Sequence, residues 1–312
     1  MRIGVTGGAG FIGSNLADQL LAIGHHVSIL DNFDSGFEKN LISKNIKIIN
    51  GDVSIKHDVE NFFDSENIQF CFHLAAMGSV PRSILETEKS FNSNTVATFN
   101  IAEAIRERKI TTVFSSSSSV YGFNKKQPKS ESDWIAPISP YAGFKAAAES
   151  ILQGYANVFN LDIKIFRLFN VYGPKQNPNS QYSAVIPKWI MAAIEKKPLI
   201  VFGNGEQKRD FTYVADVLKV FIKSIDQTPN NNLPVNLAFG NSLTLNSVLQ
   251  IFKEYFGNIE IIYSPVRQGD IKDSESDPRE LKSIYPDIKE TQIRTGLFET
   301  FDWYIRNYKK AK

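Results

Sequence analysis

The stretch Thr6-Gly7-Gly8-Ala9-Gly10-Phe11-Ile12-Gly13 decides how this chain folds. It follows a short apolar run at 3–6 and opens a segment, 11–23, whose apolar residues have helical spacing. Glycines in a turn between a strand and a helix let the backbone approach a pyrophosphate, which the free N–H groups of the helix N-terminus then bind. The alternative interpretation is a glycine-rich turn that binds nothing.

Short apolar runs alternate with helical patterns through the first half of the chain. We expect further strands at 26–30, 46–50, 70–74, 111–115 and 163–168, and helices at 94–106 and 141–159. This alternation predicts an α/β fold, a doubly wound parallel sheet with helices on both faces. After about residue 175 the alternation stops. A helix at 184–195 and short strands at 234–239 and 259–263 predict a smaller C-terminal α/β region.

Composition excludes several classes of protein. The 312 residues carry 35 Lys plus Arg and 33 Asp plus Glu, a formal charge of 35 − 33 = +2, which gives no general field for nucleic acid or anionic membranes. A single cysteine, Cys71, excludes a disulfide framework, and with only four histidines we expect no metal site. The sequence has no apolar run near 18 residues and starts without a signal-peptide pattern, so we expect a cytoplasmic protein.

Carboxylates end the second and third expected strands. Asp31 lies 18 residues past Gly13, where a carboxylate binds the adenosine ribose hydroxyls and would repel a 2′-phosphate, so NAD is favoured over NADP. Asp52 ends the third strand, where it can meet the adenine amino group with Val53 against the ring; a plain turn aspartate is the alternative. Cys71 and His73 in the fourth strand are interpreted as core residues.

Tyr141 and Lys145 start the long helix expected at 141–159. A spacing of four puts both side chains on one helix face, and an ammonium beside a phenol favours the phenolate, which makes tyrosine a usable base. Five serines, 115–119, follow the strand at 111–115; because ligands bind at the carboxyl ends of strands in such sheets, we interpret them as a site and not as a linker.

Taken together, these motifs resemble the extended short-chain dehydrogenases/reductases of the NAD-dependent nucleotide-sugar epimerase/dehydratase family. The resemblance runs over nearly the whole chain, through TGGAGFIG, LDN, GDV, HLAA, SSSSSVYG, SPYAGFK, RLFNVYGP, VFGNGEQKRDFTYVAD and RQGD. It implies a Rossmann-type domain at 1–172 plus about 211–240. A UDP-sugar-binding domain, interleaved with it, would occupy about 173–210 plus 241–312.

The resemblance also implies roles for individual residues. Ser117, four residues before the tyrosine of V-Y-G, Tyr141 as base and Lys145 as its partner form the implied catalytic set. Implied NAD contacts are Gly7, Gly10, Phe11, Ile12, Gly13, Asp31, Asn32, Gly36, Asp52, Val53, Leu74, Ala75, Ala76, Asn94, Ser115, Tyr141, Lys145 and Phe169. Implied substrate contacts are Gly78, Ser79, Arg82, Ser117, Ser118, Ser119, Tyr141, Asn170, Gln176, Val185, Ile200, Phe202, Arg209, Arg267, Asp270 and Ser274.

The residues after Ser117 indicate the type of reaction. Dehydratases of the family carry Asp-Glu there and decarboxylases keep a Glu, whereas this chain has Ser118 and Ser119. The resemblance therefore favours 4-epimerisation through a 4-keto sugar, with NAD tightly bound and regenerated in each turnover. Three alternatives stay open: a UDP-glucose/UDP-galactose or UDP-glucuronate 4-epimerase, a decarboxylase or reductase of the same fold, and a binding protein without catalysis.

The segments at 78–83 and 176–189 resemble bacterial epimerases that act on UDP-N-acetylhexosamines and their uronates. Ser274 stands where glucose/galactose-only members place a tyrosine, so a small side chain leaves room for an acetamido group. We expect UDP-GlcNAc/UDP-GalNAc interconversion, for polysaccharide biosynthesis, by a homodimer formed through the helices at 94–106 and 141–159. Phe144 departs from the small or hydroxyl residue that is usual before the lysine.

Overall fold

The computed structural model describes residues 1–178, 184–227, 232–266 and 273–311, and the side chains only as far as 308. The chain divides into two compact units that interleave along the sequence. Unit 1 contains Met1–Asn124, Trp134–Leu168 and Leu218–Val235, and unit 2 contains Lys125–Asp133, Phe169–Val217 and Asn236–Lys312.

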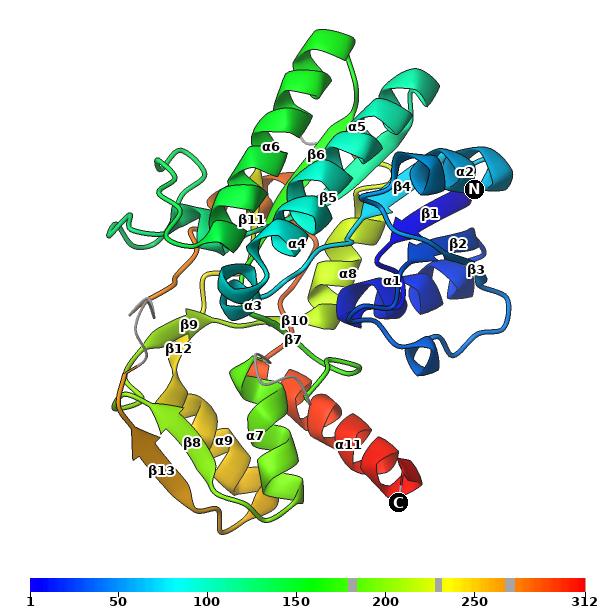
Figure 1. Cartoon of the computed structure of the whole chain (residues 1–312). Coiled ribbons are helices and arrows are strands. Elements are labelled where there is room, and N and C mark those ends of the chain that lie inside the picture. The colour runs from blue at the N-terminus through cyan, green and yellow to red at the C-terminus, as the bar shows by residue number, and fades with distance from the viewer. Residues whose placement is uncertain (179–183, 228–231, 267–272, 312) are drawn as a thin grey trace. The chain divides into compact units, whose positions relative to one another are not determined.

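A seven-stranded sheet organises unit 1, in the order β11-β6-β5-β4-β1-β2-β3 (Figure 1). Its strands are β1 (Arg2–Thr6), β2 (His26–Asp31), β3 (Lys47–Asn50), β4 (Phe70–His73), β5 (Thr111–Ser117), β6 (Ile163–Leu168) and β11 (Val235–Leu237). Neighbours from β6 to β3 pair in parallel. This confirms the doubly wound α/β fold. The strand order changes direction between β1 and β4, and such sheets bind ligands at that point.

The helices of unit 1 cover both faces of this sheet. They are α1 (Phe11–Ala22), α2 (Lys56–Glu66), α3 (Val80–Leu85), α4 (Thr87–Phe91), α5 (Ala97–Arg108), α6 (Pro140–Phe159) and, from Leu218 onward, α8 (Val214–Lys223). Figure 1 shows α5 and α6 side by side. Side chains alternate along β4, as a strand requires: Cys71 joins the core of α2, α5 and α6, whereas Phe72 packs on Phe221 of α8.

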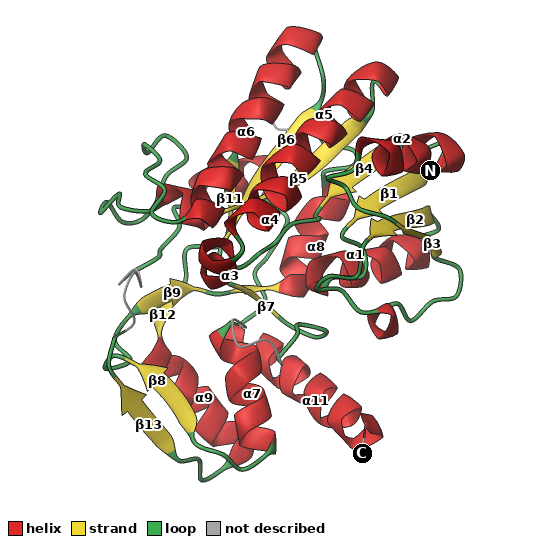
Figure 2. Cartoon of the chain, viewed as in Figure 1, coloured by secondary structure: helices red, strands yellow, loops and turns green. Residues whose placement is uncertain are grey.

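Unit 2 is a smaller α/β assembly of short pieces (Figure 2). Its strands form three pairs: β7 (Val171–Tyr172) with β10 (Thr212–Tyr213), β8 (Leu199–Phe202) with β13 (Ile261–Ser264), and β9 (Lys208–Asp210) with β12 (Ser242–Thr244). Its helices are α7 (Val185–Ile194), α9 (Leu245–Phe256), α10 (Arg279–Ile284) and α11 (Ile293–Ala311). Phe252 joins them, since its ring contacts Trp189 of α7 and Phe301 of α11.

Two expected elements differ from the structure. The strand expected to end at Ser115 continues to Ser117, because Ser116 and Ser117 pair with Arg167 and Leu168 of β6. The helix expected to start at Asn94 is preceded by α4 and by a π-helical turn, Asn92–Val96, that leads into α5. There the side-chain amide of Asn94 donates to the Ser90 carbonyl, and the backbone carbonyl of Asn94 accepts from the Thr98 hydroxyl. Such turns are frequent at functional sites.

In the described part of the chain, no helix is long and apolar enough to cross a membrane.

Asp210 gives unit 2 a pH dependence. Burial, with a smaller contribution from Glu290, raises the pKa of this carboxyl to about 6 against the bonds it accepts from the Gly240 and Ser276 amides. A raised pKa means that folding favours the protonated form, so its stabilising effect is complete below the ordinary pKa and is lost as the pH rises through about 6.

We therefore expect the Asp210→Asn variant, which keeps the shape without the charge, to gain stability relative to the wild type as the pH rises from 4 to 7. The relative gain should be about 3 kcal/mol, from roughly 1.4 kcal/mol per pKa unit. Denaturant unfolding of both proteins across this range measures the difference. A difference that does not change with pH would contradict the assignment.

Candidate functional site

The glycine loop forms a backbone cradle at the start of α1. A Cβ added to Gly13 would lie 2.3 Å from the Gly7 carbonyl oxygen, and one on Gly7, whose φ is +69°, would lie 2.7 Å from the backbone of Ala75. Gly10 is the N-cap of α1 and has no side chain to cap the helix. The N–H groups of Phe11, Ile12 and Gly13, in the first turn, are therefore available to bind an anion. This loop fits a pyrophosphate group.

Asp31 ends β2, and Asp52 follows β3 two residues after its last residue, Asn50. The carboxylate of Asp31 accepts from the Ala9 amide at 2.8 Å and from the Phe33 amide at 2.8 Å, which ties β2 to the glycine loop. Burial raises its pKa. Asp52 accepts from the Asn32 amide at 2.8 Å and from Ser54. Hydrogen bonds thus hold each of the two carboxylates expected at the adenosine in place, and their remaining lone pairs can accept from hydroxyls.

Three further expected cofactor residues of unit 1 lie against this loop. Gly36 lies against Ala9, and Leu74 and Ala75 pass over Gly7. Below them His73 is buried, with its two nitrogens bonded to Thr6 and Thr98, which agrees with its interpretation as a core residue. Asn94 is buried too, and its Oδ1 has no hydrogen-bond partner among the described residues, so it can accept one from a ligand.

Ser117, Tyr141 and Lys145 come together at the carboxyl end of β5 and the first turns of α6. The Tyr141 hydroxyl is hydrogen-bonded to Ser117, whose oxygen also contacts Ser119. Ser139 caps α6 by accepting from the Ala142 amide, and the Tyr141 amide donates to Ser83 at 3.0 Å. The helix start that carries the tyrosine is therefore fixed from both sides.

Lys145 is buried below the tyrosine. Its Nζ donates to the Ser115 carbonyl at 2.9 Å and lies 4.7 Å from the centre of the Phe114 ring. Burial lowers the pKa of Lys145 to about 8, against an opposing effect of Glu149. Burial raises the pKa of Tyr141, and the bond to Ser117 lowers it. The two shifts move these pKa values apart, so burial makes the lysine easier and the tyrosine harder to deprotonate than in water.

The expected substrate residues of the 78–83 segment are placed at α3. Ser79 caps this helix by accepting from the Arg82 amide at 3.3 Å. The Arg82 guanidinium forms ion pairs with Asp34 and Glu86, so it is already engaged in this structure. Gly78 has open space where a Cβ would stand. Phe144 packs edge-on against Phe91 of α4, which explains how a large residue fits before Lys145.

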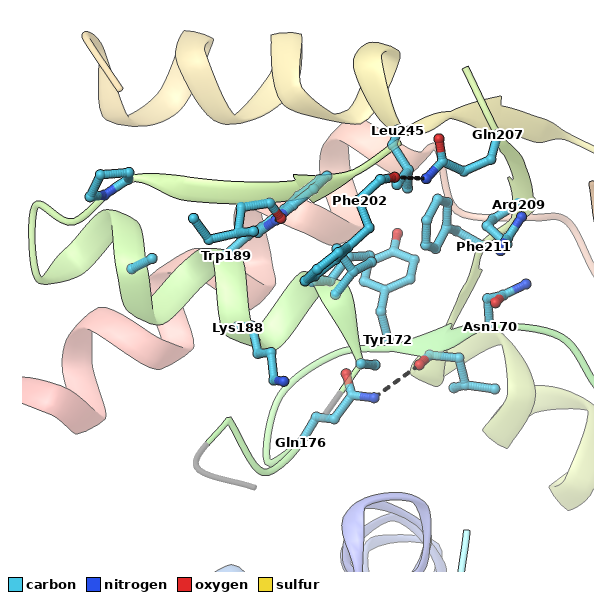
Figure 3. A pocket seen from close by; sticks show the side chains of 17 residues that line it. Asn170, Tyr172, Gln176, Lys188, Trp189, Phe202, Gln207, Arg209, Phe211 and Leu245 are labelled. Carbon is cyan, nitrogen blue, oxygen red and sulfur yellow. Dashed lines mark hydrogen bonds between the residues drawn. The ribbon is translucent and has the colours of Figure 1, made fainter. Parts of the chain in front are cut away.

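Unit 2 contains a pocket of about 460 Å³ that opens among α7, β8 and β9. Asn170 and Arg209 lie at one end of it, and Gln176 and Lys188 point into it from below the aromatic wall (Figure 3). Five expected substrate residues besides Arg209 line it: Asn170, Gln176, Val185, Ile200 and Phe202. The Oε1 atom of Gln176 is buried without a partner among the described residues. Aromatic surface with a few amides and cations fits a nucleotide.

Ser274 lies directly beside Arg209. The two residues form a parallel bridge, in which the Asp210 amide donates to the Ser274 carbonyl at 2.9 Å and the Ser274 amide to the Lys208 carbonyl at 3.1 Å. This places the expected size-determining residue next to the expected phosphate-binding arginine. Arg267 and Asp270, the other two residues expected there, lie outside the described residues. Phe169, expected to contact NAD, is buried at the start of unit 2.

The structure adds residues that sequence reasoning missed. Tyr172, Lys188, Trp189, Gln207 and Phe211 also line the pocket of unit 2. In unit 1, Glu149 and Arg167 form a buried ion pair beside the catalytic residues. A signal was available for this pair, because Glu149 continues the Tyr141–Lys145 spacing of four and Arg167 follows two apolar residues in the strand at 163–168.

Comparison with known proteins agrees with this geometry. The model of the NAD dependent epimerase/dehydratase family matches residues 3–238. The chain is 37% identical to a UDP-N-acetylglucosamine 4-epimerase from Methanobrevibacter ruminantium M1, solved in complex with UDP-N-acetylmuramic acid, with a TM-score of 0.92 and 98% of each chain covered. It is 30% identical to a UDP-glucose 4-epimerase from Thermus thermophilus, solved with NAD, with a TM-score of 0.89 over 98% of this chain and 99% of that one.

A relative with different chemistry is about as similar in sequence as the Thermus enzyme. The UDP-N-acetyl-alpha-D-glucosaminuronate decarboxylase of Bacillus cytotoxicus is 31% identical, over 96% of both chains. The chain therefore belongs to the NAD-dependent epimerase/dehydratase family, with NAD as its cofactor. This confirms the resemblance seen in the sequence and the nicotinamide cofactor expected from the glycine loop and Asp31.

Replacing Gly13 by Ala should abolish the cradle, because the new Cβ would meet backbone atoms that have nowhere to move. We expect NAD affinity to fall at least about tenfold. NAD retained on the purified protein and calorimetric titration measure the effect.

The matched control is Gly154→Ala, since Gly154 lies inside α6 with open space around it. Alanine favours a helix over glycine, so this variant should fold at least as well as the wild type and keep its NAD. Unchanged NAD affinity in Gly13→Ala would contradict the proposed pyrophosphate site.

Proposed function

We propose that this protein is an NAD-dependent UDP-sugar 4-epimerase that interconverts UDP-GlcNAc and UDP-GalNAc, with the corresponding uronic acids as candidate further substrates. Unit 1 would bind NAD and carry out the chemistry, and unit 2 would hold the uridine diphosphate. The observation that carries the proposal is the set formed by Ser117 at the end of β5 and by Tyr141 and Lys145 on α6. Ser118 and Ser119 follow Ser117, where carboxylates would stand in dehydratases and decarboxylases.

The three residues would act on one oxygen of the sugar. Tyr141 removes the proton of the 4-hydroxyl, and Ser117 hydrogen-bonds the same oxygen from the strand end. Lys145, bonded to the Ser115 carbonyl, supplies positive charge that favours the phenolate. When bound, NAD supplies the hydride acceptor for C4 and returns the hydride to the other face of the 4-keto sugar. Tyr141 then gives the proton back, so no net oxidation results.

Elimination and decarboxylation are the competing reactions. Dehydration needs an acid and a base at the positions of Ser118 and Ser119, which have only hydroxyls. Glu149 on α6, four residues after Lys145, is bonded through both carboxylate oxygens to Arg167. It is therefore not free to move a proton of the substrate. These features favour epimerisation over the reaction of the Bacillus decarboxylase.

The pocket of unit 2 supports a nucleotide diphosphate as the handle of the substrate. Its aromatic wall, which includes Phe202 and Phe211, offers surface for a base, and Arg209 offers a cation for phosphate. Gln176 has a buried oxygen ready to accept a hydrogen bond. Arg82 would join only by exchanging its present partners, Asp34 and Glu86.

We also propose a cytoplasmic homodimer that uses α5 and α6. Phe99 on α5 is 45% exposed, and its ring contacts Tyr155 of α6 edge-on. Val158 on α6 is exposed as well. An apolar surface shared by two adjacent helices fits self-association.

Tyr141→Phe should reduce kcat by roughly 10²–10⁴-fold, because the phenol oxygen is the proposed base. NAD content should remain at the wild-type level, since the glycine loop is untouched. Turnover with UDP-GlcNAc, followed through the anomeric-proton NMR signal of the product, measures kcat. Turnover close to that of the wild type would overturn the role of Tyr141.

Ser274→Tyr should select against N-acetylated substrates. A phenol beside Arg209 would occupy the space proposed for the acetamido group, so kcat/KM for UDP-GlcNAc should fall at least about tenfold more than for UDP-glucose. The assay compares UDP-GlcNAc, UDP-glucose and their uronates with both proteins by NMR.

Equal losses on both substrates would remove Ser274 as the determinant. A wild-type enzyme that converts UDP-glucose but leaves UDP-GlcNAc untouched would overturn the substrate. Release of carbon dioxide would favour the decarboxylase alternative, and net consumption of NADH would favour the reductase alternative.

A further inference from the structure

Glu149 is a buried carboxylate on α6 that the proposed reaction does not use. Only 3% of the residue is exposed. Its Oε1 accepts from Arg167 Nε at 3.0 Å and from the Ser116 hydroxyl, and its Oε2 accepts from Arg167 Nη2 at 2.8 Å. A carboxylate held on both oxygens by a guanidinium keeps its charge and cannot serve as a mobile acid or base.

The two elements that carry the proposed catalytic residues, β5 and α6, meet β6 at this group. Ser116 lies on β5 between Ser115, whose carbonyl accepts from Lys145, and Ser117. Arg167 on β6 also donates to the Tyr121 hydroxyl at 2.9 Å and lies over the ring of Tyr121 at 4.9 Å. Tyr121 ends the 3-10 turn that follows Ser117.

Glu149 also shares a helix face with the catalytic pair. Tyr141, Lys145 and Glu149 follow one another at intervals of four residues along α6, so the carboxylate lies one turn beyond the ammonium. Such a negative charge favours the protonated form of a buried lysine, whereas burial opposes it.

The other groups that face Lys145 supply little opposite charge. From β5 come the Phe114 ring and the Ser115 carbonyl, which are uncharged. From β4 comes His73, whose pKa burial and Lys145 lower to about 3, so it is neutral in the working pH range. Tyr141 faces it from α6, and the positive charge of Arg167 on β6 is paired with Glu149. Glu149 is thus the source of fixed negative charge for the lysine within this described group.

We propose that Glu149, clamped by Arg167 and Ser116, is a positioning residue that keeps Lys145 positively charged and fixes the strand end that carries Ser117. The role of Lys145 itself rests on the proposed function. The charge state of Lys145, however, can be measured without any turnover.

The test is Glu149→Gln, which keeps the shape and an acceptor oxygen but removes the charge. In NAD-loaded protein labelled with ¹³C-lysine, the ¹³Cε signal of Lys145, assigned by its absence in Lys145→Met, reports the titration. We expect its apparent pKa to fall by about one unit, as removal of one nearby charge in a buried site implies. Glu149→Asp, which keeps the charge, should recover most of the shift.

The matched control is Lys164→Met. Lys164 lies on β6, like Arg167, and is as deeply buried as Glu149. Its ammonium is held by the Ser224 carbonyl and by Asp162. Its loss removes a buried ion of the same strand away from the catalytic residues, so it should leave the titration of Lys145 unchanged. A titration of Lys145 at the wild-type pH in Glu149→Gln would overturn the proposal, as would an equal shift in Lys164→Met.

The kcat–pH profile gives a second readout. Because the proposed reaction needs a charged Lys145 beside Tyr141, and the loss of the Glu149 charge lowers the pKa of the lysine, the profile of Glu149→Gln should move to lower pH by about one unit, with a lower maximum. A purely structural role would lower kcat at every pH without moving the profile, and this outcome would also overturn the proposal. If Glu149→Gln does not fold, Arg167→Gln leaves the Glu149 carboxylate without its guanidinium, so the pKa of Lys145 should rise, and an unshifted Lys145 there overturns the proposal.

The two proposals fail in different ways. A shifted Lys145 in an enzyme that does not epimerise UDP-sugars would support the role of Glu149 and contradict the function. Epimerisation with an unshifted Lys145 would do the reverse.

Discussion

The buried pair of Glu149 and Arg167 is the interaction on which the reactive end of unit 1 depends. It joins α6 to β6 through two charge-assisted bonds and reaches β5 through Ser116 and the turn after it through Tyr121. Removing one partner of such a pair typically costs about 3–5 kcal/mol, because the other charge stays buried and unpaired. The positions of Ser117, Tyr141 and Lys145 are therefore set by polar contacts beneath them as well as by the apolar core.

Local positive charge, and not the net charge of the chain, accounts for the ligand sites. A net charge of +2 gives no strong general field, and NAD and a UDP-sugar are both anionic. The chain meets this demand locally, with the open N-terminus of α1 in unit 1 and with Arg209 and Lys188 in the pocket of unit 2. Two arginines of unit 1 pair with carboxylates instead: Arg82 with Asp34 and Glu86, and Arg167 with Glu149.

Much of unit 1 could be predicted from sequence because its signals are local. Glycines in TGGAGFIG, apolar runs and the spacing of Tyr141 and Lys145 depend on neighbours within a few residues. The extension of β5 to Ser117 could not, since serines have little preference for strands and pairing with β6 decides it. The π-helical turn at Asn94 was missed for the same reason, because it depends on bonds to Ser90 and Thr98.

The sequence by itself determined the class of fold, the family and the nicotinamide cofactor, and it predicted the reactive side chains, because each is encoded in short motifs whose chemistry is fixed by residue type and spacing. Only the tertiary structure decided that Arg82 is held by Asp34, that Ser274 lies beside Arg209, and that Glu149 is clamped one turn beyond Lys145. These contacts join residues that lie 18 to 65 positions apart, as in the pairs Glu149–Arg167 and Arg209–Ser274. Contacts across the fold select these partners, so a local pattern such as the four-residue spacing of Glu149 can mark a residue but cannot identify its partner.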